Sequence, residues 1–168
     1  MNIRYYLVDV HTAEISEECT HHTYAKLDTA DRHVNAPPGS LIQCDDSVIK
    51  SQWYRFTGAA GFAMPETCPA ISSCGTSAPG WLNGAHPTVA EGKVTRTVCY
   101  HWAGSCCAWS NPVKVQNCVH FYIYFFQPPE GCDRRYCGTS VGKCEFRAFC
   151  SLERLHWWCL ILGFVRME

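Results

Sequence analysis

Short runs of β-branched and aromatic residues, broken by glycine and proline, dominate the hydrophobic pattern of this chain. Such runs predict β-strands, and they occur at residues 5–10, 53–57, 94–102, 112–116 and 121–126. The last run is the strongest, because six strand-forming residues follow one another before Pro128 and Pro129 end it. No helical periodicity precedes residue 145, and no internal repeat is present. The pattern predicts a β-rich small domain with mostly antiparallel strands and long loops.

Two segments between these runs lack a regular pattern. Residues 19–44 carry turn-forming Asp, Pro and Gly residues, and residues 68–87 are rich in glycine and proline. We expect little regular structure in the second segment, which Cys68, Cys74 and Trp81 would pin to the core.

The C-terminal tail differs from the rest of the chain. Ser151 can cap a helix that ends at Gly163, so a short C-terminal helix is predicted there. The apolar stretch 157–165 has nine residues, too few to span a bilayer. The first ten residues also lack the 7–15-residue apolar run of a secretory signal peptide.

Charge and length limit the partners that this chain can have. With 168 residues, 47% of them hydrophobic, the chain suits one domain with modest extensions. Lys and Arg number 14 against 15 Asp and Glu, so no basic field favours nucleic acid. Composition does not indicate the ligand.

The 13 cysteines carry more information. So many cysteines indicate either metal sites in a reducing compartment or a disulfide framework in an oxidising one. Zinc sites favour pairs of cysteines with two to four residues between them. The nearest approach, Cys132 and Cys137, has no matching second pair. We therefore expect disulfides, a secreted or cell-surface protein, and no metal or cofactor; an intracellular zinc-binding protein is the alternative that the missing signal peptide leaves open.

Three of these cysteines, Cys99, Cys106 and Cys107, lie within nine residues. Neighbouring Cα atoms are about 3.8 Å apart, whereas a relaxed disulfide needs roughly 4.4–6.8 Å. Cys106 and Cys107 should therefore have separate partners, and in extended chain they would point to opposite faces. The odd total leaves at least one thiol unpaired. The tail residues Cys144, Cys150 and Cys159 are the candidates for a free thiol or an intermolecular disulfide.

Catalytic motifs are poorly supported. Residues 138–142 match the Gly-x-Ser-x-Gly string around Ser140, but that motif needs a strand-to-helix turn and later Asp and His partners. Only His156 follows, and no alternation of strands and helices exists, so a flexible linker is the preferred interpretation. A cysteine nucleophile needs a free thiol beside a histidine. Gly58 and Gly61 lack a phosphate-loop lysine. We expect no enzyme and no catalytic residue.

Several polar and aromatic residues are candidates for binding. Trp81, Asn83 and His86 are candidates for a binding surface on the long loop, although a tryptophan in such a loop more often anchors it to the core. Three other tryptophans are interpreted as core residues: Trp53, Trp102 and Trp109. Arg134 and Arg135 beside Asp133 are interpreted as a solvated turn, with a site for an acidic partner as the alternative.

Four blocks of the sequence resemble a known family. The blocks WYRFTGAAGFAMPETC, CGTSAPGWLNGAHP, EGKVTRTVC and PPEGCDRRYC are similar to the eight-cysteine domain of the uromodulin and pancreatic secretory-granule glycoprotein family. The eight cysteines correspond to Cys68, Cys74, Cys99, Cys106, Cys107, Cys118, Cys132 and Cys137. Cys19 and Cys44 resemble the additional pair of a ten-cysteine form. The resemblance implies a domain at residues 19–138, an N-terminal extension at 1–18 and a tail at 139–168.

The resemblance also implies the disulfide pairing. Carried over position by position, it joins Cys19–Cys118, Cys44–Cys132, Cys68–Cys106, Cys74–Cys137 and Cys99–Cys107. Each bridge contributes roughly 2–4 kcal/mol. Five of them are comparable with the whole net stability of a domain, about 5–15 kcal/mol.

The function that the resemblance implies is recognition. In the family this region helps to present N-linked glycans to bacterial adhesins, which requires Asn-x-Ser/Thr. None of the five asparagines here lies in such a sequon, and Asn83-Gly84-Ala85 breaks the one that relatives have. We expect a non-catalytic recognition or adhesion module with an extracellular protein or glycan ligand, no nucleic acid, and membrane attachment only through other parts of the protein. A structural spacer in a filament or matrix protein is the alternative.

Overall fold

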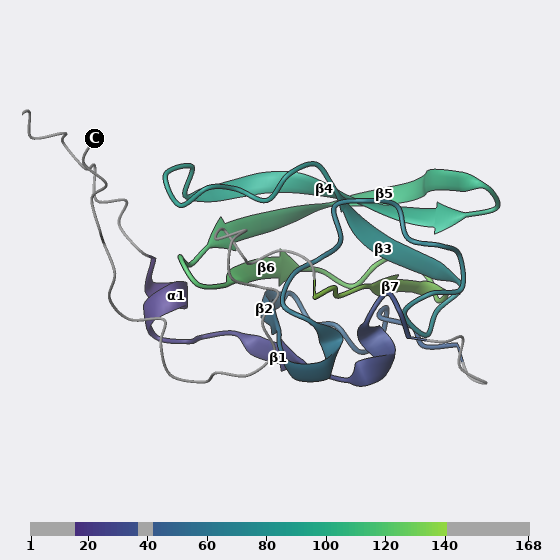
Figure 1. Cartoon of the computed structure of the whole chain (residues 1–168), viewed down its shortest axis with the longest axis horizontal. Coiled ribbons are helices and arrows are strands. Elements are labelled where there is room, and N and C mark those ends of the chain that lie inside the picture. The colour runs from purple at the N-terminus through teal and green to yellow at the C-terminus, as the bar shows by residue number, and fades with distance from the viewer. Residues whose placement is uncertain (1–15, 37–41, 141–168) are drawn as a thin grey trace, which may run out of the picture.

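The computed structural model describes residues 16–36 and 42–140. Their elements run along the chain as three short helical turns and seven strands (Figure 1). The helical turns are α1 (Glu17–Thr20), η1 (Ala30–Arg32) and η2 (Gly58–Ala60). The strands are β1 (Ala25–Leu27), β2 (Gln52–Phe56), β3 (Ala78–Asn83), β4 (Lys93–Trp102), β5 (Ser105–Asn117), β6 (Tyr122–Phe126) and β7 (Arg134–Tyr136).

All seven strands form one sheet in the order β1-β2-β6-β5-β4-β3-β7. The outermost pairs, β1 with β2 and β3 with β7, are parallel, and the four pairs between them are antiparallel. The long β4–β5 hairpin extends past the end of β6 (Figure 1). The prediction of a β-rich, mostly antiparallel domain is confirmed.

Most strand predictions match the structure, and two expectations were wrong. The runs 53–57, 94–102, 112–116 and 121–126 correspond to β2, β4, β5 and β6. Segment 68–87 contains β3, which was predicted to be loop, and a short helix, α1, precedes residue 145. The predicted strand 5–10 and helix 151–163 lie outside the described residues.

Strand β3 forms because its two neighbours hold it, not because its sequence favours a strand. It pairs with β4 on one side and with β7 on the other. At Gly80 an added Cβ would lie 2.8 Å from the Arg135 carbonyl oxygen and 2.9 Å from the Tyr100 ring. Glycine, which weakens a strand by itself, is therefore what allows β3 to pack this closely.

The core lies on one face of the sheet, and aromatic residues are its largest side chains. Alternate residues of β2 and β6 enter it, as expected for a period of two, and Phe126 stacks on Tyr136 with ring centroids 3.8 Å apart. On the other face a smaller cluster surrounds the Cys19–Cys118 bridge and Ile123, with Trp53 packed against it. Trp53 is thus half-buried, partly as predicted.

Five disulfides connect the described segments. They join Cys19–Cys118, Cys44–Cys132, Cys68–Cys106, Cys74–Cys137 and Cys99–Cys107, with Cα–Cα distances between 4.7 and 5.7 Å. These are the five pairs that the family resemblance implies. Cys106 and Cys107 have different partners, so one bridge closes the β4–β5 hairpin and the other ties it to the loop before β3.

The solvated turn predicted at Arg134 and Arg135 was wrong. These residues begin β7, and Arg135 is 5% exposed. Its guanidinium contacts Asp31 at 3.0 Å and donates to the Cys74 carbonyl oxygen at 2.9 Å. The chain turns before Arg134, at Gly131 and Asp133, which have positive φ angles.

The linker predicted after Cys137 is also wrong for its first residues. Gly138 bridges to His33, and Thr139 bridges to Ala63. Both residues are buried. A Cβ at Gly138 would lie 2.0 Å from the Ala60 carbonyl oxygen, so glycine is required there.

Candidate functional site

The three residues predicted as a binding loop separate into two places. Trp81 and Asn83 are two residues apart on β3 and therefore share a face of the sheet. The Trp81 indole N–H donates to the Cys106 carbonyl oxygen at 2.8 Å, so this side chain ties β3 to the hairpin. His86, three residues after β3 ends, lines a cavity that neither Trp81 nor Asn83 lines.

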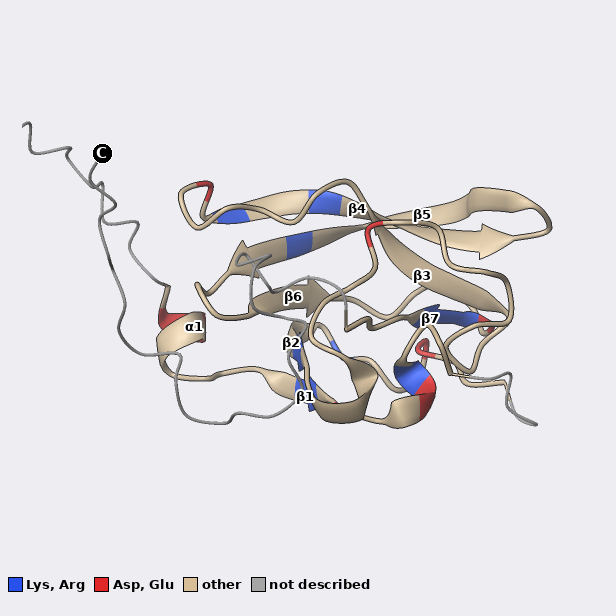
Figure 2. Ribbon diagram, in the orientation of Figure 1, with Lys and Arg blue, Asp and Glu red and all other residues tan. Residues whose placement is uncertain are grey.

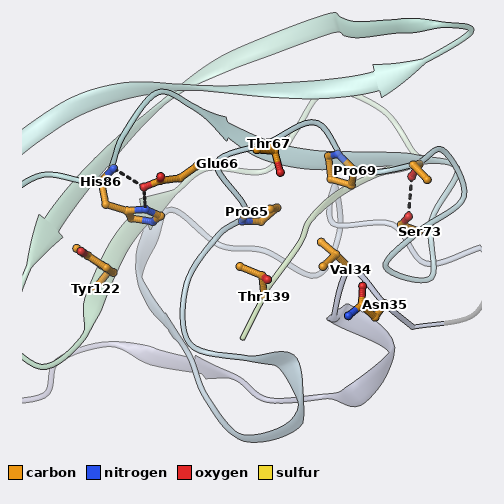
Figure 3. Close-up of a pocket in the computed structure, with 11 residues that line it drawn as sticks. Val34, Asn35, Pro65, Glu66, Thr67, Pro69, Ser73, His86, Tyr122 and Thr139 are labelled. Atoms are coloured by element: carbon orange, nitrogen blue, oxygen red, sulfur yellow. Dashed lines mark hydrogen bonds and ion pairs between the residues drawn. The ribbon is translucent and has the colours of Figure 1, made fainter. Parts of the chain in front are cut away.

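This cavity has a volume of about 620 Å³ and lies between the loop after β2 and residues 34–35 (Figure 3). Its wall mixes apolar and hydroxyl or amide groups, including Val34, Pro65, Pro69, Asn35, Thr67 and Thr139. His86, Glu66 and Tyr122 gather at one end (Figure 3). The His86 ring packs against Tyr122 with centroids 4.3 Å apart and the ring planes tilted by 31°.

Hydrogen bonds fix the His86 ring on both nitrogens. The Glu66 carboxylate accepts from the His86 backbone N–H at 2.7 Å and from the ring Nδ1. The ring Nε2 lies 2.7 Å from the Tyr124 hydroxyl, which also accepts from the Met64 N–H at 3.0 Å. Burial raises the pKa of Tyr124 well above its usual 10, so this hydroxyl keeps its proton and donates a hydrogen bond to Nε2 when the imidazole is neutral.

Glu66 is the charged end of this chain of hydrogen bonds. Partial burial would raise the pKa of Glu66, but hydrogen bonds from the His86 backbone and ring lower it below the usual value. The carboxylate therefore stays ionised at neutral pH and orients the ring. This arrangement fixes the position of the loop after β3.

Ser140, the serine of the Gly-x-Ser-x-Gly string, does contact a histidine. His33 Nε2 lies 3.0 Å from the Ser140 hydroxyl oxygen. The other ring nitrogen accepts the Asn35 backbone N–H at 3.1 Å, so no carboxylate orients this ring as in a catalytic triad. Ser140 follows an isolated bridge and not a strand of a parallel sheet.

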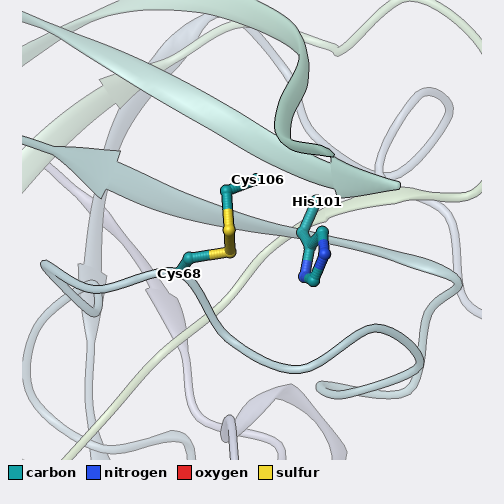
Figure 4. Close-up of side chains that lie close together, drawn as sticks. All are labelled: Cys68, His101 and Cys106. Atoms are coloured by element: carbon teal, nitrogen blue, oxygen red, sulfur yellow. A yellow bond between two sulfur atoms is a disulfide. The ribbon is translucent and has the colours of Figure 1, made fainter. Parts of the chain in front are cut away.

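Two clusters among the described residues have the residue types of a metal site, and both contain a disulfide: Cys44, Cys132 and Asp133 form one, and the other includes a histidine. The side chains of Cys68, His101 and Cys106 bring their ligand atoms within 4.8 Å of one another (Figure 4). The two sulfurs form a disulfide, however, and a metal binds thiolate. His101 Nδ1 lies 2.7 Å from the Pro69 carbonyl oxygen and donates to it. Oxidised, this cluster offers one imidazole nitrogen and no thiolate ligand.

The hairpin formed by β4 and β5 exposes two tryptophans. Trp102 and Trp109, predicted as core residues, are 41% and 38% exposed, so that prediction was wrong. The hairpin extends beyond β6, its neighbouring strand in the sheet, and it turns through Ala103 and Gly104, both with positive φ. The two indole rings lie 6.2 Å apart, and the Arg134 guanidinium lies 4.3 Å from the Trp109 ring centroid. We call Trp102, Trp109 and Arg134 the tryptophan platform.

Charge is absent from the outer half of this hairpin. No Lys, Arg, Asp or Glu occurs in residues 97–113, and Figure 2 shows this end of the ribbon without charged positions. Within the described part of the chain, the guanidinium of Arg134 and the ammonium group of Lys114 make no ion pair or hydrogen bond; each lies over an aromatic ring. This uncharged run was the sequence signal that could have identified the platform.

A seven-stranded sheet held by five disulfides defines the class of this chain: a disulfide-stapled, β-rich extracellular domain. Residues 54–138 match the family model of the uromodulin-like eight-cysteine domain. The chain belongs to this family.

Three relatives show the extent of the similarity. The chain is 44% identical over 126 residues to the pancreatic secretory granule membrane major glycoprotein GP2 of Canis lupus familiaris, covering 73% of this chain and 24% of that protein. It is 47% identical over 97 residues to uromodulin of Mus musculus (55% and 15%) and 34% identical over 155 residues to GP2 of Mus musculus (86% and 28%). The chain thus spans about a quarter or less of the length of most of these relatives.

The family and the disulfides place this domain among secreted and cell-surface proteins. The name of GP2 describes it as a membrane glycoprotein of the pancreatic secretory granule. None of the helices in residues 16–36 and 42–140 is long and apolar enough to cross a bilayer.

Proposed function

We propose that this domain is a non-catalytic extracellular recognition module that binds a protein partner through the tryptophan platform. The observation that carries the proposal is the pair of exposed tryptophans, Trp102 and Trp109, beside the guanidinium of Arg134. Tryptophan and arginine are enriched among the residues that dominate binding energy at protein interfaces, and charged residues are depleted at interface cores. An uncharged hairpin with this composition fits such an interface.

Rigidity supports the same proposal. The Cys99–Cys107 bridge closes the hairpin, Cys68–Cys106 ties it to a neighbouring loop, and the Trp81 indole donates to its backbone. A surface that is already ordered loses less conformational entropy on binding. The platform is thus held in place before any partner arrives.

We place the module at residues 19–138. The bridges that begin at Cys19 and end at Cys137 support these limits. The absence of catalysis is supported by the chemistry of the two histidine sites: the buried Tyr124 hydroxyl occupies the His86 nitrogen that Glu66 does not hold, and His33 lacks an orienting carboxylate among the described residues.

The test titrates labelled chain onto intact epithelial cells and onto a glycan array. We expect saturable cell binding that protease treatment of the cells abolishes and that the Trp102→Ala, Trp109→Ala double variant weakens at least about tenfold. Phe62→Ala is the matched control, because Phe62 is an exposed aromatic residue (53%) outside the platform. Its binding should equal that of the unchanged chain.

Other outcomes would overturn parts of the proposal. Binding that survives protease treatment and matches glycans on the array would replace the protein partner with a glycan. Loss of binding in Asn83→Ala, with the double tryptophan variant unaffected, would move the site to the loop predicted from the sequence. No saturable binding on either surface would favour the structural spacer.

A further inference from the structure

Strand β5 has one edge that is paired along only part of its length. β4 pairs with β5 from Ser105 to Gln116. On the other side β6 pairs with only four residues, from Lys114 to Asn117. Within the described chain, residues 105–112 therefore have no strand on their second edge, and the free part of β5 projects beyond β6 (Figure 1). We call residues 105–112 of β5 the open edge.

The open edge lacks most features that protect strand edges from pairing. Native edges are usually short, charged, bulged away from partners or covered. Every residue of this edge except Asn111 is exposed, and none carries a charge. Pro112, at its inner end, is the one residue that cannot donate a backbone hydrogen bond. An exposed, uncharged edge is a template for strand addition.

The charges around the open edge indicate what kind of strand it accepts. Arg134 lies over Trp109 on the core-side face of the sheet, and Lys114 follows the edge on the opposite face, over the Phe125 ring. Neither cation has a carboxylate partner within the described residues. A second copy of the open edge would bring no acidic residue to either of them.

We propose that the open edge accepts an extended strand from another protein, with a small or apolar side chain against Trp109 and carboxylates toward Arg134 and Lys114. The proposal rests on the proposed function, since it specifies how the hairpin binds its partner. Backbone hydrogen bonds to residues 105–112, apart from the Cys106 carbonyl oxygen that already accepts the Trp81 indole N–H, would supply part of the affinity, and side chains alternating between the two faces would supply the specificity.

The experiment selects peptides from a displayed library of random eight-residue segments on the full chain. We expect enrichment of extended sequences that contain Asp or Glu with apolar residues at alternate positions. A selected peptide should then slow hydrogen exchange at the amides of residues 105–112. Its binding should weaken about tenfold in Arg134→Glu, less in Lys114→Glu, and not at all in Lys26→Glu, an exposed lysine on the distant strand β1.

A backbone-edge test separates strand addition from simple charge attraction. Ser110 is exposed on the open edge, so Ser110→Glu should repel the acidic strand, whereas Ser110→Lys should retain binding. Thermal melts of each variant verify folding, and Lys114→Glu keeps the test decisive if Arg134→Glu does not fold.

Several results would overturn the proposal. Enrichment of peptides without acidic residues, no enrichment at all, or a bound peptide that leaves exchange at residues 105–112 unchanged would each exclude this mode of binding. A dimer in sedimentation equilibrium that Ser110→Glu dissociates would make a second copy the occupant. If strand addition fails while Trp102→Ala, Trp109→Ala still abolishes cell binding, the proposed recognition function stands and only its mode is wrong.

Discussion

Two neighbouring arginines on β7 have opposite surroundings. Arg135 is almost completely buried and contacts two carboxylates, Asp31 at 3.0 Å and Asp45 at 4.0 Å. Arg134 points to the other face, as successive strand residues do, and lies over Trp109 without a carboxylate partner among the described residues. The same residue type thus stabilises the fold at position 135 and is available to bind a partner at position 134.

The buried side of this comparison is centred on Asp45, which is fully buried. Arg32 donates to both oxygens of this carboxylate, at 2.7 and 2.8 Å, and the Tyr136 backbone N–H donates to it at 2.9 Å. Burial and the neighbouring Arg32 lower the pKa of Arg135, which the two carboxylates partly offset. Buried charges are tolerated only when they are paired and hydrogen-bonded in this way.

The exposed side needs no such compensation. Arg134 is half-buried, so solvent reaches part of its guanidinium, and the Trp109 ring adds a cation–π contact of roughly 0.5–1 kcal/mol. A guanidinium that solvent already reaches can form an ion pair with a partner's carboxylate without disturbing the core. The difference between the two arginines therefore separates residues that fold the domain from residues that are available for binding.

The largest expected effect follows from removing the centre of the buried cluster. Asp45→Ala leaves Arg32 buried without its carboxylate and should lower the free energy of unfolding by about 3–5 kcal/mol. Chemical denaturation measures this change. Asp46→Ala is the matched control, because the Asp46 carboxylate accepts a single local N–H, from Ser47 at 2.7 Å, and should cost less than about 1 kcal/mol. Equal losses in the two variants would contradict the role given to Asp45.

The comparison also shows what could be predicted from the sequence. Runs of β-branched and aromatic residues identified β4 and β6, because such residues favour strands that pack against a core. Strand β3 was missed, since Pro79 and Gly80 disfavour a strand until β4 and β7 pair with it. The cysteine blocks carried the family and the pairing that it implies, which spacing alone could not give.

The site was harder to predict than the fold. Trp102 and Trp109 were assigned to the core, like Trp53, because a tryptophan more often anchors its segment to the core than lines a binding surface. Their exposure depends on how far the β4–β5 hairpin extends past β6, and this length is set by where Pro128 and Pro129 end the neighbouring strand. Likewise, the different roles of Arg134 and Arg135 depend on a strand of three residues that no sequence pattern marks.

A smaller effect is expected when the two arginines are exchanged for alanine one at a time. Arg135→Ala removes charged hydrogen bonds to Asp31 and to the Cys74 carbonyl oxygen, and should cost about 2–3 kcal/mol. Arg134→Ala should change the free energy of unfolding by less than about 1 kcal/mol. Denaturation of both variants in parallel measures the difference. A larger loss for Arg134→Ala would mean that the platform is part of the core.

The smallest effect concerns Asp31 at the margin of the buried cluster. Partial burial would raise the pKa of Asp31, but hydrogen bonds from Thr29 and Arg135 and the positive charge of Arg135 lower it below its usual 3.8. A pKa lowered by folding means that the folded state binds fewer protons, so the stabilisation is complete above pH 3.8 and is lost as the pH falls through the folded-state value. The carboxylate is 47% exposed, so we expect Asp31→Asn to cost less than about 1 kcal/mol at pH 7. Urea titrations should show this difference shrinking between about pH 5 and about pH 2. If the difference persists unchanged at the lowest pH, the effect of Asp31→Asn comes from packing and not from the ion pair between Asp31 and Arg135.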